Sequence, residues 1–468
     1  MVEVTLYLIW AVATAAIGSG FQHGYNIGVL NTPEEVIKDW MVSDGGFEPR
    51  NDSEEHKEED IVWVWSMIVS TFCIGGMIGG ALTGFLANKL GRRWALILNN
   101  IFAIIAGLFF GSSKMIGTFY FLFLGRFFIG VNAGLNAGLA PLYICEISPT
   151  AIRGATGSMY QLSITITIFI ANMLGHQQVL GTESGWPILV ALVIVVAVYQ
   201  IIGMIFCPET PKYLVEKGRN DEAKKVTEKL GGKDSDVQFA ETVKDVEDAK
   251  GLPTVTVKEM IQQKKLRKPL IIICFLMFAQ QLSGINAVMF YSTAIFVMSK
   301  SSLETSQLNS VGVMALNVLT TVLSVYLVER FGRKLLLLLA FGGMIITTAI
   351  LCGSLYYVEE KEAARYVAII MVYAYVFFFA VGAGSIPWLL GPELFNTASR
   401  PLACSIAVPT NWIFNFIVGI GFRPLQMEMG PAVFSIFLIC QIITVVVVWF
   451  FVPETKNKPI DEITALFE

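Results

Sequence analysis

Charged residues are scarce in this chain. Of its 468 residues only 15% are charged, compared with about 25% in an ordinary soluble domain, and 54% are hydrophobic. A soluble protein of this composition would have little polar surface to face water, which argues against a soluble globular fold. Apolar runs of about 18 or more residues recur throughout, and each is long enough to cross a bilayer as a helix.

Cysteine chemistry and secretion signals have little support. The seven Cys lie in or at the ends of apolar runs without metal-ligand spacing, so we expect no disulfide framework and no zinc site. No cationic stretch precedes the first apolar run, and we therefore interpret residues 5–30 as a retained helix. No nucleophile–base constellation is evident. We expect a protein that is not an enzyme, with no cofactor, no metal and no nucleic-acid partner.

Twelve apolar runs predict an all-α membrane protein with twelve transmembrane helices. They lie at about 5–30, 61–86, 94–112, 118–144, 155–176, 186–206, 269–297, 306–328, 335–355, 364–390, 402–422 and 431–452.

Three short charged sequence motifs occur twice in the same order. Asn88-Lys89-Leu90-Gly91-Arg92-Arg93 returns as Glu329-Arg330-Phe331-Gly332-Arg333-Lys334, Glu146 with Arg153 returns as Glu393 with Arg400, and Pro208-Glu209-Thr210 returns as Pro453-Glu454-Thr455. The chain is therefore two copies of one unit. Duplicated membrane halves place a solute site where they meet, and rocking of one half against the other alternates access to it.

The repeat predicts four regions. We expect an N-terminal six-helix bundle at 1–206, a hydrophilic helical linker at 207–268, a C-terminal six-helix bundle at 269–452 and a tail at 453–468. The linker contains 14 basic and 12 acidic residues. The helical spacing of Ala223, Val226 and Leu230 predicts short amphipathic helices there. The linker could be a solubilising connection or a latch, and the sequence leaves both open.

Positive charge is concentrated on one side of the predicted membrane domain. The linker, the repeated motifs and the tail contain 24 of the 33 Lys and Arg, whereas the opposite loops contain 8. Positive charge is retained in the cytoplasm, so both termini are expected there, and we expect a multi-pass protein of the plasma membrane. The sequon Asn51-Asp52-Ser53 falls in the loop 31–60, which this topology places outside, and predicts glycosylation of Asn51.

Polar side chains inside membrane spans are candidates for a solute site, because they are costly unless they face a cavity or a partner. Here they are mostly neutral amides: Gln22, Asn26, Gln161, Gln280, Gln281, Asn286, Asn317, Asn411 and Asn415. Amides both donate and accept, which suits a neutral, hydroxyl-rich solute. Any single amide could instead join two helices.

Two segments combine polar residues with helix breakers. Gln280-Gln281-Leu282-Ser283-Gly284-Ile285-Asn286 places amides on both sides of a Gly that can end a helix. Trp388 follows Gly382, Gly384 and Pro387. Broken helices at membrane depth are tolerated where they line a cavity, which favours a cavity over a lipid-interface position for Trp388. Asn411 and Asn415 are four residues apart and share a helix face.

The duplicated charged motifs predict ion-pair clusters that gate the cytoplasmic side in one conformation. The alternative is that they only retain positive charge in the cytoplasm, but repetition of both the Glu and the Arg positions favours a network. The predicted members are Arg92, Arg93, Glu146, Arg153, Glu209, Glu329, Arg333, Glu393, Arg400 and Glu454.

The chain resembles the facilitative hexose transporters (GLUT-type) of the sugar-porter branch of the major facilitator superfamily. The resemblance covers nearly the whole chain and rests on Gly-Arg-Arg at 91–93, Pro-Glu-Thr-Pro at 208–211, Gln-Gln-Leu-Ser-Gly-Ile-Asn at 280–286 and Ile-Pro-Trp at 386–388. It implies twelve helices in two pseudo-symmetric six-helix bundles with short intracellular helices. It also implies sugar contacts at Gln161, Gln280, Gln281, Asn286, Asn317, Trp388 and Asn411, with Asn415 nearby.

Departures from the family pattern concern the sugar. Ala380 stands where glucose carriers of the family usually have Glu, Met277-Phe278-Ala279 replaces a common Gln-Leu-Ser, and His23 replaces an aromatic residue. Trp388 and Asn411 are residues that fructose-selective relatives tend to lack. We expect facilitative transport of glucose, with fructose as a second candidate. His23 and Asn26 are candidate cavity residues.

Two rival functions remain open at this point. Proton-coupled relatives have Asp where this chain has Asn26, and an amide cannot titrate, which favours a uniporter over a proton–sugar symporter. His23 could still titrate near neutral pH. A non-transporting sugar sensor is the other rival, although such proteins commonly add a long cytoplasmic tail. We expect a hexose substrate, a lipid bilayer as surroundings and function as a monomer.

Overall fold

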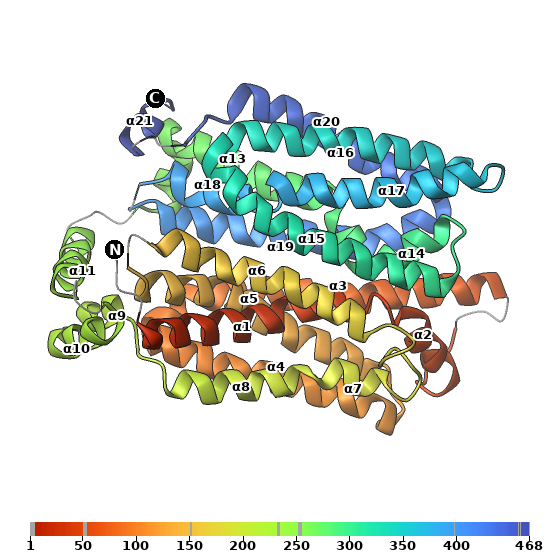
Figure 1. The fold of residues 1–468 in the computed structure, drawn as a ribbon, viewed down its shortest axis with the longest axis horizontal. Helices are drawn as coiled ribbons and strands as arrows, with labels where there is room; N and C mark the ends of the chain where they lie inside the picture. The colour runs from red at the N-terminus through yellow and green to blue at the C-terminus, as the bar shows by residue number, and fades with distance from the viewer. Residues whose placement is uncertain are drawn as a thin grey trace.

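The computed structural model describes residues 5–467 except 50–53, 150–151, 232–234, 251–254, 397, 457 and 459. The predicted glycosylation site Asn51 lies outside the described residues. Most of the described residues are helical, and the long helices run side by side along the longest axis (Figure 1).

The first helices form what we call the N-set, drawn in red to yellow in Figure 1. It consists of α1 (Leu6–Gly28), α2 (Glu34–Ser43), α3 (Glu54–Leu90), α4 (Arg92–Ile116), α5 (Tyr120–Ile147), α6 (Arg153–Leu174), α7 (Trp186–Ala191) and α8 (Val193–Ile205).

The later helices form the C-set, drawn in green to blue beside the N-set. It consists of α13 (Lys264–Leu282), α14 (Ile285–Met298), α15 (Leu303–Phe331), α16 (Arg333–Tyr356), α17 (Glu362–Phe378), the π-helical turn η3 (Phe379–Ala383), α18 (Ile386–Leu394), α19 (Arg400–Met429), the short 3-10 turn η4 (Gly430–Ala432) and α20 (Val433–Phe451).

Shorter helices gather at one end of the molecule. They are α9 (Pro211–Glu216), α10 (Asn220–Gly231), α11 (Ser235–Lys250), α12 (Val257–Gln262) and α21 (Ile460–Ala465). Both chain ends lie there, so we call it the terminal end, and we call the opposite end, where α2 lies, the loop end (Figure 1). The helix α10 contains Ala223 and Leu230 in buried positions, as their spacing predicts.

Ten ranges of the described chain are long and apolar enough to span a membrane. The last of them, Arg400–Phe451, contains both α19 and α20. The helix α1 is not among the ten but packs lengthwise against α5, α6 and α8. Its many Gly, Ser and amide residues lower its hydropathy while it remains 23 residues long, enough to cross a bilayer. Together these segments account for the twelve predicted spans.

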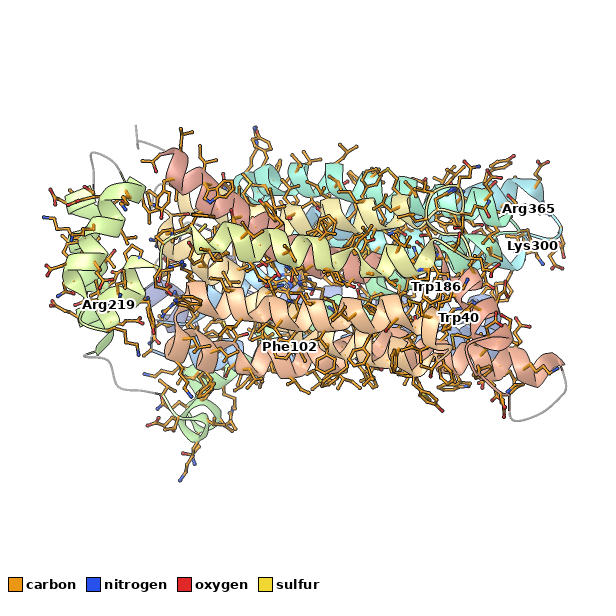
Figure 2. All side chains as sticks on the ribbon, turned by 90° about the horizontal axis from the view of Figure 1, so that it is seen from below. Trp40, Phe102, Trp186, Arg219, Lys300 and Arg365 are labelled. Carbon is orange, nitrogen blue, oxygen red and sulfur yellow. The ribbon has the colours of Figure 1, made fainter. Side chains whose placement is uncertain are left out.

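Charge and apolar surface are separated along the molecule. Arg219 lies at the terminal end, Lys300 and Arg365 lie at the loop end, and Phe102 lies between them (Figure 2). Leu108 in α4 and Leu319 in α15 are 60% and 69% exposed within the spans. Apolar side chains exposed along the middle of the bundle indicate a lipid-facing belt.

Candidate functional site

The first predicted helix break is present. The helix α13 ends at Leu282 and α14 begins at Ile285, with Gly284 between them at φ +99°, a conformation that L side chains rarely adopt. The break frees the carbonyl of Ser283, which accepts hydrogen bonds from Tyr375 Oη at 2.9 Å and Gln441 Nε2 at 2.8 Å. Side chains of the protein thus satisfy the Ser283 carbonyl, which would be costly to leave unpaired inside a membrane.

The second break lies opposite the first. The helix α17 ends at Phe378 and continues as the π-helical turn η3 before α18 begins at Ile386. Here the carbonyls of Ala383 and Gly384 accept from Gln280 Nε2 at 2.8 and 2.9 Å. One amide of α13 therefore ties the two broken helices together.

Four of the predicted residues form a hydrogen-bonded group that we call the amide cluster: Gln280, Gln281, Asn286 and Asn411. Asn411 Nδ2 donates to Gln280 Oε1 at 2.8 Å, and Gln281 Nε2 donates to Asn411 Oδ1 at 2.9 Å. Asn286 Nδ2 donates to Gln281 Oε1. All four side chains are buried. The cluster joins α13, α14 and α19 and contains no charged group.

The chemistry of the cluster suits exchange with hydroxyl groups. Each amide offers donors and an acceptor, and the bonds that the four make with one another could be made with a polyol instead. Each exchange replaces one neutral hydrogen bond by another, so the net gain per bond is about 1 kcal/mol or less. Such a site favours modest affinity for an uncharged solute.

Trp388 lies beside the cluster rather than in it. It is 37% exposed and lines an apolar cavity of about 80 Å³. Met277 lines the same cavity, and its carbonyl accepts from Asn411 Nδ2 at 3.4 Å. The indole thus forms part of an apolar wall next to the amide cluster.

The remaining predicted contacts are separate from the cluster. Asn415 lies one turn beyond Asn411 on α19, and its buried Oδ1 has no hydrogen-bond partner among the described residues. Asn317 on α15 is buried, and its side chain makes no hydrogen bond within the described part of the chain. Gln161 on α6 is exposed. These three amides are available to a solute without breaking a bond within the cluster.

Gln22 serves helix packing inside the N-set. Its Nε2 donates to Asn100 Oδ1 at 2.7 Å and Gln200 Oε1 at 2.8 Å, and its Oε1 accepts from Asn132 Nδ2 at 2.8 Å. These residues are fully buried. Here the helix-joining interpretation of an intramembrane amide applies, because every polar atom of the side chain has a partner in the same set.

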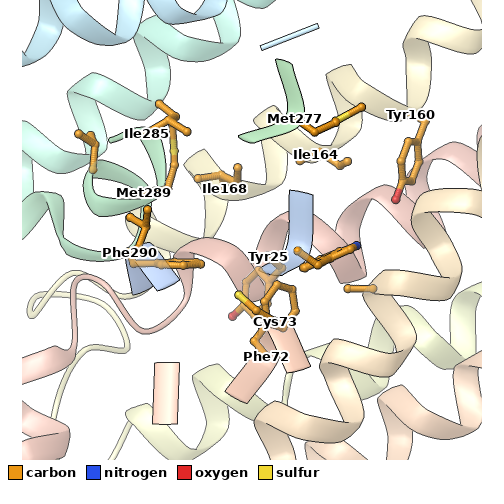
Figure 3. Packing of buried hydrophobic residues seen from close by; sticks show 14 of the residues in the cluster. Tyr25, Phe72, Cys73, Tyr160, Ile164, Ile168, Met277, Ile285, Met289 and Phe290 are labelled. Atoms are coloured by element: carbon orange, nitrogen blue, oxygen red, sulfur yellow. The ribbon is translucent and has the colours of Figure 1, made fainter. Parts of the chain in front are cut away.

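His23 lies where the two sets meet. Its Nδ1 is 2.9 Å from Tyr160 Oη, and its ring stacks on Trp412 of α19 with centroids 5.9 Å apart. Nearby apolar side chains of α6 and α14, including Ile168 and Met289, face one another across the same boundary (Figure 3). The structure therefore places His23 next to the residue that follows Asn411 in sequence.

Asn26 lies beside a buried cation. Arg126 is 1% exposed and donates to the backbone carbonyls of Asn26 at 2.6 Å and Val69 at 2.8 Å. Its guanidinium lies 4.6 Å from the ring centroid of Phe72. No carboxylate pairs with Arg126 among the described residues, and carbonyl dipoles and the aromatic face stabilise its charge instead.

The duplicated motifs build matching clusters at the terminal end. Arg92 Nε lies 2.9 Å from Glu146 Oε2, and Arg333 Nη2 lies 2.7 Å from Glu393 Oε1. Thr210 Oγ1 donates to Glu146 at 2.6 Å, and Thr455 Oγ1 donates to Glu393 at 2.5 Å. Each Arg–Glu pair lies within its own set.

Two further carboxylates cap helices. Glu209 accepts from the backbone N–H groups of Arg92 and Arg93 at 3.0 and 3.2 Å, and Glu454 accepts from those of Arg333 and Lys334 at 2.9 and 3.0 Å. A carboxylate at the start of a helix is favourable. Gly91 at φ +88° and Gly332 at φ +89° form the matching tight turns that place these helix starts.

The two capping carboxylates differ in their electrostatics. Burial raises the pKa of Glu209 above its ordinary value despite its backbone hydrogen bonds. Burial also acts to raise the pKa of Glu454, but the backbone N–H groups of Arg333, Lys456 and Lys334 outweigh it and lower the pKa. The matching motifs are therefore not electrostatically equivalent.

The predicted partners of Glu146 and Glu393 were Arg153 and Arg400, and the structure differs. Arg153 is exposed, and Arg400 donates to the carbonyl of Phe395 at 3.3 Å. The turn at Gly91 brings the start of α4 against the last turn of α5, so Arg92 reaches Glu146 first, and the matching turn does the same for Arg333 and Glu393.

Two other predicted gate residues make no carboxylate–cation pair within the described ranges. Glu329 is exposed, and the guanidinium of Arg93 donates to the carbonyls of Met204 and Ile205. Among the described residues no hydrogen bond joins the N-set to the C-set at the terminal end. In this conformation the predicted clusters therefore join helices within one set and do not join the two sets.

Hydrogen bonds between the sets are found at the loop end, which sequence reasoning missed. Asn31 Nδ2 donates to Ser292 Oγ at 2.7 Å, and its Oδ1 accepts from the N–H of Thr293 at 3.2 Å. Gln307 Nε2 donates to the carbonyl of Thr32 at 2.8 Å. The only sequence signal for this contact is the presence of Asn and Gln near span ends. The conformation is closed at the loop end.

Comparisons with known proteins agree over nearly the whole chain. A sequence profile described as "Sugar (and other) transporter" matches residues 11–467. Solute carrier family 2, facilitated glucose transporter member 3 of Mus musculus is 38% identical over 474 residues, covering 100% of this chain and 94% of that protein. Member 1 of Gallus gallus is 37% identical over 467 residues, covering 99% and 94%.

Solved structures show the same fold. The xylose transporter XylE from E. coli, in a partially occluded inward open conformation, has a TM-score of 0.80 at 24% identity and covers 97% of this chain and 99% of its own. The proton:xylose symporter XylE of the major facilitator superfamily, bound to 6-bromo-6-deoxy-D-glucose, has a TM-score of 0.78 at 25% identity, with 99% coverage of both chains. The predicted all-α fold with twelve membrane helices in two bundles is confirmed.

Proposed function

The chain belongs to the sugar transporter family, and from that membership we propose that it carries hexose across a membrane by facilitated diffusion, with D-glucose as the preferred substrate and fructose as a second candidate. The observation that carries the proposal is the uncharged amide cluster at the two helix breaks. It provides donors and acceptors for hydroxyl groups and no ion for a charged solute.

The proposed mechanism is alternating access. Sugar binds between the N-set and the C-set, where Gln280, Gln281, Asn286 and Asn411 exchange their mutual hydrogen bonds for sugar hydroxyls and Trp388 contacts the ring. The two bundles then rock, and for inward transport the loop end closes as the terminal end opens. A millimolar dissociation constant corresponds to about −4 kcal/mol, which a few such bonds and the contact with the indole can supply.

The environment of Arg126 supports uniport over proton coupling. A coupling carboxylate would be expected beside a buried cation, and this position is held by Asn26, which does not titrate. The carbonyls that Arg126 contacts cannot titrate either. Sugar movement is then driven only by its own gradient.

The proposed topology follows the charge distribution. We place the terminal end and both chain termini in the cytoplasm and the loop end outside, in the plasma membrane, with the chain functioning as a monomer in a lipid bilayer. The regions are then 1–206 and 269–452 as the moving bundles, 207–268 as the intracellular helical linker and 453–468 as the tail. The conformation closed at the loop end is inward-facing in this frame.

Uptake into proteoliposomes tests the proposal. Labelled glucose should enter down its gradient, unlabelled fructose should compete more weakly than glucose, and a protonophore or an imposed pH gradient should change neither rate nor final level. Accumulation above the external concentration in a pH gradient would contradict uniport. Binding without uptake would instead indicate a sugar sensor.

A further inference from the structure

A row of cations opens α13 where the chain enters the membrane. Lys264, Lys265 and Arg267 are exposed, and none of them forms an ion pair within the described ranges. The fourth cation of the row, Lys268, donates from Nζ to the carbonyl of Phe467 at 3.2 Å, next to α21. Three positive charges therefore remain free at one place on the terminal end.

Helix geometry connects these cations to the lipid-facing surface. Lys264, Arg267 and Ile271 follow one another at spacings of three and four residues and so lie on one face of α13. Ile271 is 60% exposed in the apolar part of the same span, where exposure means contact with lipid. The cations on this face continue the lipid-facing strip outward, at the depth of lipid headgroups.

The neighbouring helix α12 adds exposed apolar side chains. Val257 and Ile261 are four residues apart and are 52% and 53% exposed, while Met260 between them is buried. The nearby Glu259 is occupied at the start of the helix, where its Oε2 accepts from the N–H and Oγ1 of Thr256 at 2.8 and 2.9 Å. Exposed apolar residues beside unpaired cations are typical of a segment that lies in the membrane interface.

We propose that this surface, formed by Lys264, Lys265 and Arg267 with Val257 and Ile261, binds anionic phospholipid headgroups of the leaflet at the terminal end. Retention of positive charge on one side explains the sign of the row but requires no apolar residues beside it. A soluble anion or an acidic protein would match the charge but would leave Val257 and Ile261 in water. Continuity with Ile271 favours a lipid, whose headgroup and acyl chains meet both kinds of side chain.

The full-length variant Lys264→Gln/Arg267→Gln tests the proposal. Native mass spectrometry of the purified protein, titrated with phosphatidylserine or phosphatidylcholine, measures lipid retention. Wild type should retain phosphatidylserine preferentially, and the variant should bind it about 30-fold more weakly, as expected for the loss of two cations near an anionic surface. Binding of phosphatidylcholine should not change.

A matched control removes two exposed cations from α10. Lys225→Gln/Lys229→Gln changes the net charge equally and leaves α13 intact. This variant should retain phosphatidylserine like wild type, and an equal loss in both variants would overturn the proposal in favour of net charge alone. Melting temperatures in phosphatidylcholine should match for all three proteins. A variant that melts lower is replaced by Lys264→Ala alone, with about fivefold weaker binding expected.

The apolar pair separates a lipid from a soluble ligand. Val257→Ser/Ile261→Ser should weaken binding of phosphatidylserine, while inorganic phosphate at equal ionic strength should not compete in any variant. Unchanged binding of phosphatidylserine in this variant, or competition by phosphate, would overturn the assignment to a membrane lipid. None of these measurements depends on sugar transport, so they stand apart from the proposed function.

Discussion

Arg423 of α19 reaches across the boundary between the sets to Glu34 at the start of α2, with Nη2 3.5 Å from Oε1. Glu34 also pairs with Lys38 one turn further along α2, and its side chain is only 3% exposed. Arg423 lies 389 residues from Glu34, and both border a cavity of about 760 Å³ at the loop end. In the proposed alternating-access cycle the pair would break when this end opens, so it should favour the closed conformation.

Arg423→Gln is expected to shift the protein toward the conformation open at the loop end. Glu34 keeps Lys38, so the loss is that of one long charge-assisted bond, about 1 kcal/mol or roughly fivefold in the equilibrium. Double electron–electron resonance measures the opening as the distance between nitroxide labels at positions 35 and 359. Lys114→Gln is the matched control, because it breaks the exposed Lys114–Glu183 pair inside the N-set and should leave the distance unchanged.

The same pair predicts the response to pH. Burial acts to raise the pKa of Glu34, but the charges of Lys38 and Arg423 outweigh it and hold the pKa below its ordinary value. A lowered pKa in the closed state gives a contribution that is complete above the ordinary value of about 4.3 and is lost as pH falls through the lowered pKa. The nitroxide distance should therefore be constant from about pH 5.5 to 8 and lengthen only under strong acid. A transition near neutral pH would show that a group other than Glu34 controls the opening.

Asn26→Asp should make transport sensitive to pH. The new carboxylate would lie beside Arg126, whose guanidinium already donates to the carbonyl of residue 26 at 2.6 Å. The carboxylate at position 26 can then gain and lose a proton beside the buried Arg126, which would change the charge of the site during the transport cycle. Uptake by the variant should vary with an imposed pH gradient and respond to a protonophore, while wild type should not. A variant with wild-type behaviour would show that Asn26 does not determine coupling.

Gly284→Ala should lower stability without removing any polar contact. Gly284 has φ +99°, and a methyl group would lie 2.7 Å from Cδ2 of Phe437. Backbone strain of this kind costs about 1–3 kcal/mol. Gly342→Ala is the matched control, since no heavy atom lies within 4 Å of its added carbon. Thermal unfolding in detergent should show a clear decrease for the first variant and little change for the second.

Local patterns predicted much of the fold. The lengths of the apolar runs and the duplicated motifs predicted the twelve spans, and the glycines at 284, 382 and 384 predicted both helix breaks. These features depend on neighbouring residues and so can be seen in one chain. The bond from Gln280 to the carbonyls of η3 could not be predicted, because it depends on how two breaks about 100 residues apart meet in space.

The prediction was weaker in assigning which Arg pairs with which Glu. Sequence spacing paired Glu146 with Arg153, whereas the turn at Gly91 delivers Arg92 to the same carboxylate. The contact between Arg423 and Glu34 had no signal at all, since each looks like an ordinary charged residue at a span end. Ion pairs follow the packing of helices, which a single sequence does not contain.

Gln281→Ala should weaken sugar binding while largely preserving the fold. Gln281 donates to Asn411 and accepts from Asn286, so its loss removes a central member of the amide cluster. One lost hydrogen bond to sugar costs about 1 kcal/mol, or roughly a fivefold higher Kd. Because a ligand that binds the folded state raises its melting temperature, the increase produced by a fixed glucose concentration should become smaller.

Gln200→Ala should have the opposite effect: lower stability without sugar and an unchanged response to glucose. Gln200 accepts from Gln22 and donates to Ser19 inside the N-set, where the amides only join helices. Its loss leaves the buried donor Gln22 Nε2 and the buried acceptor Ser19 Oγ without this partner, and should lower the melting temperature without sugar by an amount equivalent to about 1–3 kcal/mol. The increase on adding glucose should then equal that of wild type. If the Gln281 variant also kept the full increase, the amide cluster would be packing alone, and the sugar site would have to be sought at Asn317, Asn415 and Gln161.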